Sequence, residues 1–364
     1  MFPRMCFNFD RLLHRKKKDD RGAITAKVDG RDLHCHSVIC NRNQRMSPDG
    51  FTLRAHKRDS SSRNEEIKER KREMANKSRQ AVSDLIHRGL RSCTPLAAPT
   101  PELFEICMEE VKSASKSFTA HLLSLMRAAH WDISAAARSI IEHASSSDPA
   151  DTSDHHLTIP HVPHVNPTHA KHALESYVTR KIFHGFENET FYIDGSLSSL
   201  LHPSEFRSDC FSQFRDMRHM DPAEVLGILP SCHFGKFAAK KYLSMVHPKM
   251  EESLFGSTEQ RRQVMDGAHP RTGFYGEYLR MAKAVWLLHL LAFAMKPSPS
   301  HFEASKGAEF HPEYMESVVR LAGGGGRVQS GWVVGFSVGP GFKLGNGSVV
   351  RARVYLVPRV RDLI

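Results

Sequence analysis

The chain has 364 residues, of which 40% are hydrophobic and 25% charged, a composition typical of a protein that buries a core. No apolar run reaches the roughly 18 residues that a membrane-spanning helix needs, which argues against an integral membrane protein. The net charge of +11 comes entirely from residues 1–91, with 23 Lys and Arg against 12 Asp and Glu, while the remainder is balanced. A basic arm on a neutral body is weaker evidence for nucleic-acid binding than a basic fold would be.

Residues 1–63 show neither the alternation of a strand nor the period of a helix. They bury too little apolar surface to offset the entropy lost on ordering, so we predict a disordered basic arm. Residues 64–91 consist mainly of strong helix formers with charged neighbours on one face, which predicts a charged helix without establishing a coiled coil. Four consecutive basic residues form a candidate nuclear-import signal: Arg15, Lys16, Lys17 and Lys18. A patch that binds an anionic surface and a solvated tail are the alternatives.

Residues 101–144 predict a helical hairpin, because their apolar residues recur at steps of three, four and seven. Thr100 is a suitable N-cap, and Pro101 fits the first helical position, where its missing N–H costs nothing. Asp132 or Ser134 is expected to cap the second helix.

Residues 145–167 are dominated by Ser, Asp and Pro, which predicts a linker. Histidines are frequent in and after this stretch, a composition that favours metal binding. However, zinc sites use paired ligands at fixed spacings, and no such pairs occur here. The cluster of Cys35, His36 and Cys40 in the arm lacks a second pair as well, so we expect no metal site.

Residues 168–320 carry apolar residues at helical spacing, which predicts a helical domain. Asp221 begins a capping-box pattern typical of a helix N-terminus. The segment that ends before Pro297 is apolar on nearly all sides, as expected of a helix at the centre of a bundle. His289 lies in its middle, where a buried, hydrogen-bonded histidine is commoner than a catalytic one.

Residues 330–358, SGWVVGFSVGPGFKLGNGSVVRARVYLVP, combine glycines with valines. A phosphate-binding loop needs a Lys followed by Ser or Thr at the start of a helix, and that pair is absent. The turn dipeptides Pro340-Gly341 and Asn346-Gly347 between two β-rich runs predict a β-hairpin or short meander instead. Alternate residues of the second run form the side that we expect to face solvent: Val349, Arg351, Arg353 and Tyr355. If this strand lies at a sheet edge, it is a candidate docking site for a partner strand. The alternative is that it pairs only within its own domain.

Together these elements predict a mainly α protein, with a helical-bundle body, a small C-terminal β-hairpin or meander and a disordered basic N-terminal arm. The sequence contains no recognised hydrolase, metalloprotease or nucleotide-binding motif. Cys232 and His233 are the best nucleophile and base candidates by type, but adjacent residues rarely face each other. We therefore expect no enzyme, no catalytic residue and no cofactor.

Three stretches carry a resemblance to a known family: HWDISAAARSI at 130–140, HALESYVTRKIFHGFENETFY at 172–192 and VGFSVGPGFKLGNGSVVRARVYLVP at 334–358. They resemble the plant-specific proteins with the domain of unknown function 641, over residues 75–358. The family's known members serve light-modulated gravitropism or interact with a leucine-rich-repeat receptor kinase, and the second kind is the closer likeness. Such proteins usually begin with a long coiled-coil-like region, most of which this chain lacks.

The resemblance implies a non-enzymatic plant signalling adaptor whose partner is a protein, such as the cytoplasmic domain of a leucine-rich-repeat receptor kinase. We expect a cytoplasmic location, with the nucleus or the periphery of the plasma membrane as alternatives. Nucleic acid is the less favoured partner, and the oligomeric state is left open. Two other functions are weighed: a nuclear protein that binds nucleic acid through the basic arm, and an enzyme of uncharacterised type.

Overall fold

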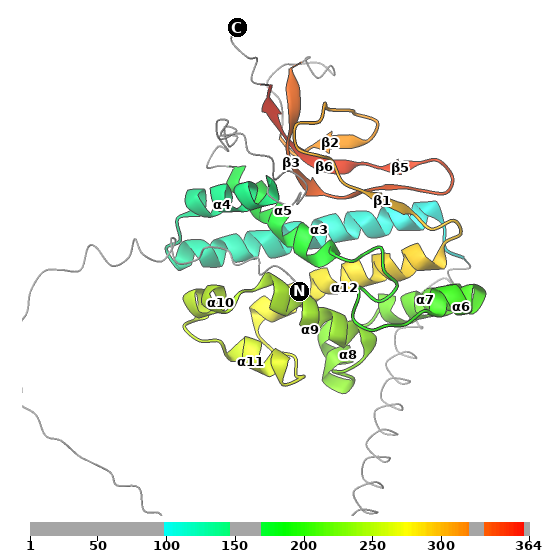
Figure 1. The fold of residues 1–364 in the computed structure, drawn as a ribbon. Helices are drawn as coiled ribbons and strands as arrows, with labels where there is room; N and C mark the ends of the chain where they lie inside the picture. The colour runs from blue at the N-terminus through cyan, green and yellow to red at the C-terminus, as the bar shows by residue number, and fades with distance from the viewer. Residues whose placement is uncertain (1–97, 146–168, 320–330, 360–364) are drawn as a thin grey trace, which may run out of the picture. The chain divides into compact units, whose positions relative to one another are not determined.

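The computed structural model describes residues 98–145, 169–319 and 331–359 (Figure 1). The predicted basic arm, the charged helix and the candidate import signal from Arg15 to Lys18 lie outside these ranges, as does nearly all of the predicted linker.

The described ranges are mainly helical, which confirms the predicted fold class. No helix in them is both long and apolar enough to cross a membrane. The helices are α3 (Pro101–Ala128), α4 (Ile133–Ser145), α5 (Ala170–Phe183), α6 (Ser198–Leu201), α7 (Pro203–Arg218), α8 (Pro222–Ile228), α9 (His233–Met245), α10 (Pro248–Phe255), α11 (Glu259–Met265) and α12 (Gly273–Ala294). The strands are β1 (Ser300–Phe302), β2 (Met315–Ser317), β3 (Trp332–Gly339), β4 (Gly341–Lys343), β5 (Val349–Val350) and β6 (Ala352–Pro358).

Side-chain caps fix the starts of several helices where the sequence predicts them. The Thr100 hydroxyl accepts a hydrogen bond from the Leu103 amide at 3.2 Å. The second helix of the predicted hairpin is capped by Asp132 and not by Ser134, since the Asp132 carboxylate accepts from the Ala135 amide at 2.9 Å. Asp221 likewise accepts from the amides of the two residues after Pro222. Each cap satisfies amides that have no partner inside the helix.

Helix α12 lies at the centre of the helical part and contacts α3, α5, α7, α8 and α9 (Figure 1). Residues 285–292 are all buried, as expected for a helix that is apolar on nearly all sides. Tyr278 is fully buried, and its hydroxyl donates to the Ala238 carbonyl oxygen at 2.6 Å. The core therefore forms around α12, and the other helices cover it.

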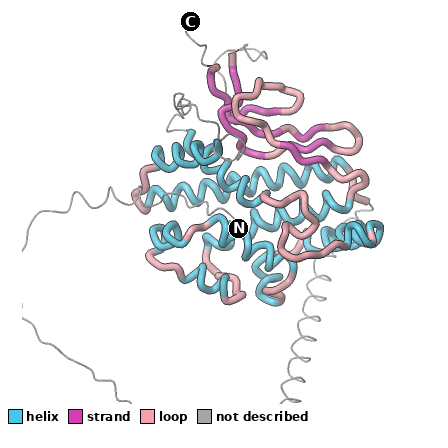
Figure 2. Tube along the Cα trace, viewed as in Figure 1, coloured by secondary structure: helices cyan, strands magenta, loops and turns pink. Residues whose placement is uncertain are grey.

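The predicted C-terminal hairpin is present and is bent (Figure 2). Strand β3 pairs antiparallel with β6, and β4 pairs antiparallel with β5. Asn346-Gly347 forms the turn as predicted: Gly347 has φ of 86°, and the Asn346 side chain accepts from the Ser348 amide at 3.0 Å. Pro340-Gly341 is not a turn, because the chain passes there from β3 into β4.

Two short strands, β1 and β2, lie within the range that was expected to be helical. They extend the hairpin into two three-stranded sheets of order β1-β4-β5 and β2-β6-β3, in which β2 runs parallel to β6. Strand β3 packs on α5, and α5 packs on α3. The sheet therefore covers α3 and α5, while α12 contacts α3 as well (Figure 1).

A pair of glycine substitutions tests how tightly α9 packs. A Cβ at Gly235 would overlap the carbonyl oxygen of Pro230, a backbone atom that cannot move freely, whereas a Cβ at Gly276 in α12 would meet nothing within 4 Å. We expect Gly235→Ala to lower the free energy of unfolding by roughly 1–3 kcal/mol, and Gly276→Ala to raise it by roughly 0.5–1 kcal/mol. Urea denaturation of both variants measures the difference, and a neutral Gly235→Ala would contradict the close contact.

Candidate functional site

The predicted docking strand is divided between two sheets: β5, with Val349, lies at the edge of one sheet, whereas β6, with Arg353 and Tyr355, does not lie at an edge. Strand β6 lies in the middle of its sheet, with β2 on one side and β3 on the other. Strand β6 is paired with β2 along 352–354 and with β3 along 353–358, so the expected open edge is absent where both neighbours pair, while partner docking by the strand as a whole stays a prediction. The open edge is absent because of β2, a three-residue strand too short to be recognised by alternation.

The four residues of the predicted docking strand are separated by the bend in the hairpin. Arg353 and Tyr355 are buried, at 6% and 5% exposure, whereas Val349 is half-buried and Arg351 is exposed. The side expected to face solvent instead packs on the helices, because Tyr355 belongs to the main core with Phe336, whose ring stacks on it at 4.8 Å. Partner binding by the remaining exposed residues stays a prediction.

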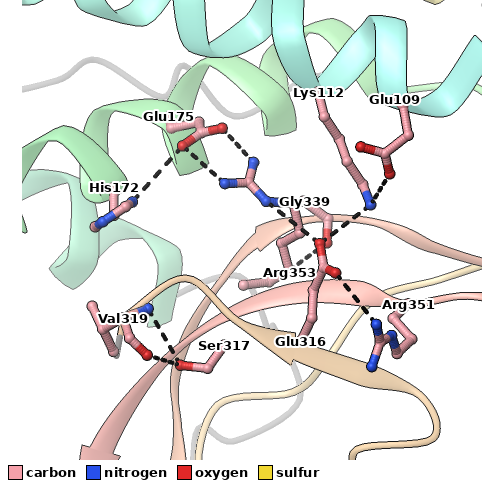
Figure 3. A network of polar contacts seen from close by, with 11 residues as sticks. Glu109, Lys112, His172, Glu175, Glu316, Ser317, Val319, Gly339, Arg351 and Arg353 are labelled. Carbon is pink, nitrogen blue, oxygen red and sulfur yellow. Dashed lines mark hydrogen bonds and ion pairs between the residues drawn. The ribbon is translucent and has the colours of Figure 1, made fainter. Parts of the chain in front are cut away.

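Arg353 forms a buried ion pair with Glu175 of α5 (Figure 3). Both terminal nitrogens of the guanidinium donate to the carboxylate: Nη1 to Oε1, and Nη2 to Oε2 at 3.4 Å. Burial alone would raise the pKa of Glu175, but the neighbouring His172 and Arg353 side chains hold it below its ordinary value. His172 Nδ1 lies 3.8 Å from Glu175 Oε2, which is too long for a hydrogen bond.

Glu316 of β2 extends this pair into a network that joins four elements, namely α3, α5, β2 and β6 (Figure 3). Its carboxylate lies 3.8 Å from Nε of Arg353 and 3.2 Å from Nζ of Lys112 in α3. Lys112 also donates to Glu109 at 2.8 Å, and exposed Arg351 lies 3.9 Å from Glu316. Charges of both signs therefore alternate through the interface between sheet and helices, which gives a buried arginine its required partners.

A cavity of about 300 Å³ lies elsewhere in the fold, and it is the candidate functional site. It is enclosed by the loop after α5, by α6 and α7, by the start of α9 and by α12. Its apolar wall is formed by Ile193, Phe206, Trp286 and Leu290. Below, we call it the α7–α12 cavity.

The loop that lines this cavity is held in place by donors to its backbone carbonyls. Lys240 donates to the Tyr192 carbonyl oxygen at 2.5 Å, Lys241 donates to that of His184, and His289 Nε2 donates to that of Asn188 at 2.9 Å. Tyr192 adopts a left-handed conformation with φ of 56°, which is strained for an aromatic residue. A strained loop persists only where its surroundings hold it, and these three donors do so.

Two buried cationic or basic groups beside the loop have shifted pKa values. Burial lowers the pKa of Lys241 to about 7, and its ammonium lies 4.8 Å from the Phe191 ring centre. Burial lowers the pKa of His289 to about 4, so this ring is neutral near pH 7. Because Nε2 donates to a carbonyl, Nδ1 carries the lone pair of the neutral ring.

Two ring nitrogens of residues that line the cavity lack hydrogen-bond partners. His289 Nδ1 and Trp286 Nε1 are both buried, and neither has a partner among the described residues. The prediction of a buried histidine is thus confirmed, with one nitrogen bonded and the other unsatisfied. Unsatisfied buried polar groups are few in native proteins, so two of them on successive turns of α12 beside the cavity are unusual.

The remaining polar lining is acidic. None of its described lining residues is Lys or Arg. Four carboxylates line the cavity: Glu189, Asp194, Glu205 and Asp209. Glu189 accepts from the amides of Ser198 and Ser199 and so caps α6. Within 98–145, 169–319 and 331–359, no three His, Cys, Asp or Glu side chains are grouped to hold a metal ion.

The cysteines of the described ranges have the properties of structural thiols. Burial raises the pKa of both Cys107 and Cys210 to about 12. Burial also raises the pKa of Cys232, whose sulfur caps α9 by accepting from the Gly235 amide at 3.4 Å. A nucleophilic cysteine needs a lowered pKa, so Cys232 is poorly suited to that role.

Sequence motifs alone did not reveal the α7–α12 cavity. Its acidic residues lie on a loop and a helix that share no spacing pattern. The residues at the bottom of the cavity, such as Trp286, lie about 80 residues further along the chain. The only signal in the sequence is the stretch GFENETFYIDG, rich in turn formers and acids, which the family resemblance includes.

The Arg353–Glu175 pair can be tested by removing one partner or both. We expect Arg353→Met to lower the free energy of unfolding by roughly 3–5 kcal/mol, because it leaves Glu175 buried without its partner. Adding Glu175→Leu should restore most of this loss. Arg351→Met is the matched control and should cost less than about 1 kcal/mol, since Arg351 is exposed. Equal losses for Arg353→Met and Arg351→Met would contradict the assignment.

His289 should contribute to acid sensitivity. Its folded-state pKa is lowered from 6.5 to about 4, so the unfolded chain takes up a proton first as the pH falls below 6.5. The contribution of His289 to the free energy of unfolding is therefore fully present above pH 6.5. It is lost as the pH falls towards 4, and the loss amounts to roughly 3 kcal/mol. We expect His289→Gln to show a shallower loss of unfolding free energy over this range in urea titrations. The exposed His311→Gln serves as control, and identical pH profiles for all three proteins would refute the expectation.

Comparison with known proteins gives two relatives and one family model. The chain is 63% identical over 273 residues to "Protein GRAVITROPIC IN THE LIGHT 1" of Arabidopsis thaliana, which covers 74% of this chain and 48% of that protein. It is 29% identical over 148 residues to the "IRK-interacting protein" of the same plant, covering 40% of this chain and 24% of that protein. No solved structure matches. The chain thus spans about half the length of the first relative.

These identities differ in one respect from what the sequence resemblance implied. The closer likeness was expected to be to the kinase-interacting kind, but the identity to the gravitropism protein is about twice as high and extends further. Residues 301–355 match the family model of the GIL1/IRKI C-terminal domain, which spans β1, β2 and the bent hairpin as far as Tyr355. The family resemblance is confirmed: the chain is similar to these two plant proteins, and its residues 301–355 match the GIL1/IRKI C-terminal domain.

Proposed function

We propose that this chain is a non-enzymatic adaptor in plant signalling, serving gravitropic growth and binding a receptor kinase. The observation that carries the proposal is the 63% identity to GRAVITROPIC IN THE LIGHT 1 over three quarters of the chain. The name of the second relative supports a kinase partner, because that protein is named for its interaction with IRK. We place the adaptor in the cytoplasm, with the nucleus or the plasma-membrane periphery as alternatives.

The chemistry of the described residues supports binding rather than catalysis. The three described cysteines have raised pKa values, which disfavours thiolate chemistry. His289 is neutral and packed against Phe191 at 4.2 Å, so it is poorly placed to exchange protons with solvent. A preformed cavity with an acidic lining suits recognition of a partner.

Direct binding and complementation test this proposal together. We expect the purified full chain to bind the purified cytoplasmic domain of IRK in biolayer interferometry, and to restore gravitropic growth in the light to Arabidopsis seedlings that lack the first relative. Cys232→Ser should restore growth equally well, because no thiol chemistry is involved. Failure in both assays would reject the adaptor, and loss of complementation by Cys232→Ser with binding intact would favour an enzyme.

A further inference from the structure

The α7–α12 cavity has a strongly asymmetric charge. Its lining holds four carboxylates and, among the described residues, no Lys or Arg. Asp209 forms no hydrogen bond or ion pair within the described ranges, and Glu205 has only the exposed His202 at 4.0 Å. The negative potential also acts on Cys210, whose pKa is raised first by burial and then by Asp209 and Glu189. A cationic group would therefore be attracted to this cavity.

The rim of the same cavity exposes apolar side chains. Seven large hydrophobic residues are exposed in the described ranges, and four of them fall between residues 192 and 201: Tyr192, Leu197, Leu200 and Leu201. Ser196 and Ser198 from this segment line the cavity, so the leucines lie next to its mouth. Leu200 is 75% exposed and Leu201 is 69% exposed. Exposed apolar residues grouped beside a cavity are typical of a protein-binding surface.

The base of the cavity favours one kind of cation. Within the described ranges, no three ligating side chains converge as they would around a metal ion. The aromatic and aliphatic wall of Phe206, Trp286 and Leu290 suits the long apolar stem of a side chain. A guanidinium supplies five N–H donors and stacks on aromatic rings, so it can bond both carboxylates while it packs on the aromatic wall.

We infer that the α7–α12 cavity is a docking site for a partner segment that inserts an arginine between Glu205 and Asp209 and lays a flanking apolar side chain on Leu200 and Leu201. The arginine stem contacts Trp286, and its guanidinium reaches the acidic lining. The inference rests on the proposed function, because an adaptor needs a surface for its partner. It adds the chemistry of that partner, namely a basic segment with an apolar neighbour.

The test uses the full chain and a random dodecamer peptide library displayed on phage. We expect selected peptides to carry arginine beside leucine or a similar apolar residue. Fluorescence anisotropy with a labelled selected peptide then compares wild type with Glu205→Gln/Asp209→Asn and with Leu200→Ser/Leu201→Ser. All four positions are exposed, so both variants should fold, which thermal unfolding checks. Each should weaken binding by about tenfold.

Two controls make the assignment specific. Glu252→Gln/Asp266→Asn removes the same charge from exposed positions outside the cavity lining and should change affinity by less than about twofold. Replacing the peptide's arginine by neutral citrulline should weaken binding to wild type but not further weaken binding to Glu205→Gln/Asp209→Asn. Selection of neutral or acidic peptides, unchanged affinity in the cavity variants, or a citrulline effect that persists in them would overturn the inference.

The same variants separate this inference from the proposed function. If IRK binds wild type but not Glu205→Gln/Asp209→Asn, both the docking site and the proposed function are supported. If arginine peptides bind in the cavity while IRK does not bind at all, the docking site stands and the kinase partner is rejected. If IRK binds the cavity variants as well as wild type, the kinase stands and the cavity is rejected as its docking site.

Discussion

The alignment of the sheet on the helices is constrained by one buried ion pair, Arg353 with Glu175. A buried arginine without its carboxylate is costly, so the fold is stable only when β6 and α5 are aligned to bring the two together. The ion pair also fixes the register of β6 within its sheet. Moving β6 by one residue would turn Arg353 towards the opposite face of the sheet, into the small apolar cluster that contains Val334, Val354 and Leu356. Glu316 and Lys112 add the parallel strand β2 and helix α3 to the same constraint.

The helical part of the fold could be predicted because its signals are local. Thr100, Asp132 and Asp221 lie next to the amides that they cap, so the residues that decide where the helices begin are adjacent in the sequence. The same is true of Asn346 and Gly347 in the hairpin turn. The apolar character of α12 likewise predicts its central position without knowledge of its neighbours.

The errors arise where the deciding partner is distant in the sequence. Alternation in VVRARVYLV gives the period of the strand but not which face is covered, and an arginine on an alternating strand normally indicates the wet side. Arg353 departs from that rule because its carboxylate partner comes from α5, 178 residues earlier. The strands β1 and β2 were missed because three residues are too few to show a period, although β2 is what turns β6 from an edge strand into a central one.

The cavity was missed for the same reason, and its construction bears on how it could bind. Its acidic residues come from a loop and from α7, while its base comes from α12, so only the folded chain brings them together. The loop is not free to adapt, since Lys240, Lys241 and His289 hold its carbonyls, and Tyr192 stays in a strained conformation. A site held in this way loses little conformational entropy when a partner arrives. The cost of ordering has already been met in folding, and this is why a short segment with few contacts could bind there with useful affinity.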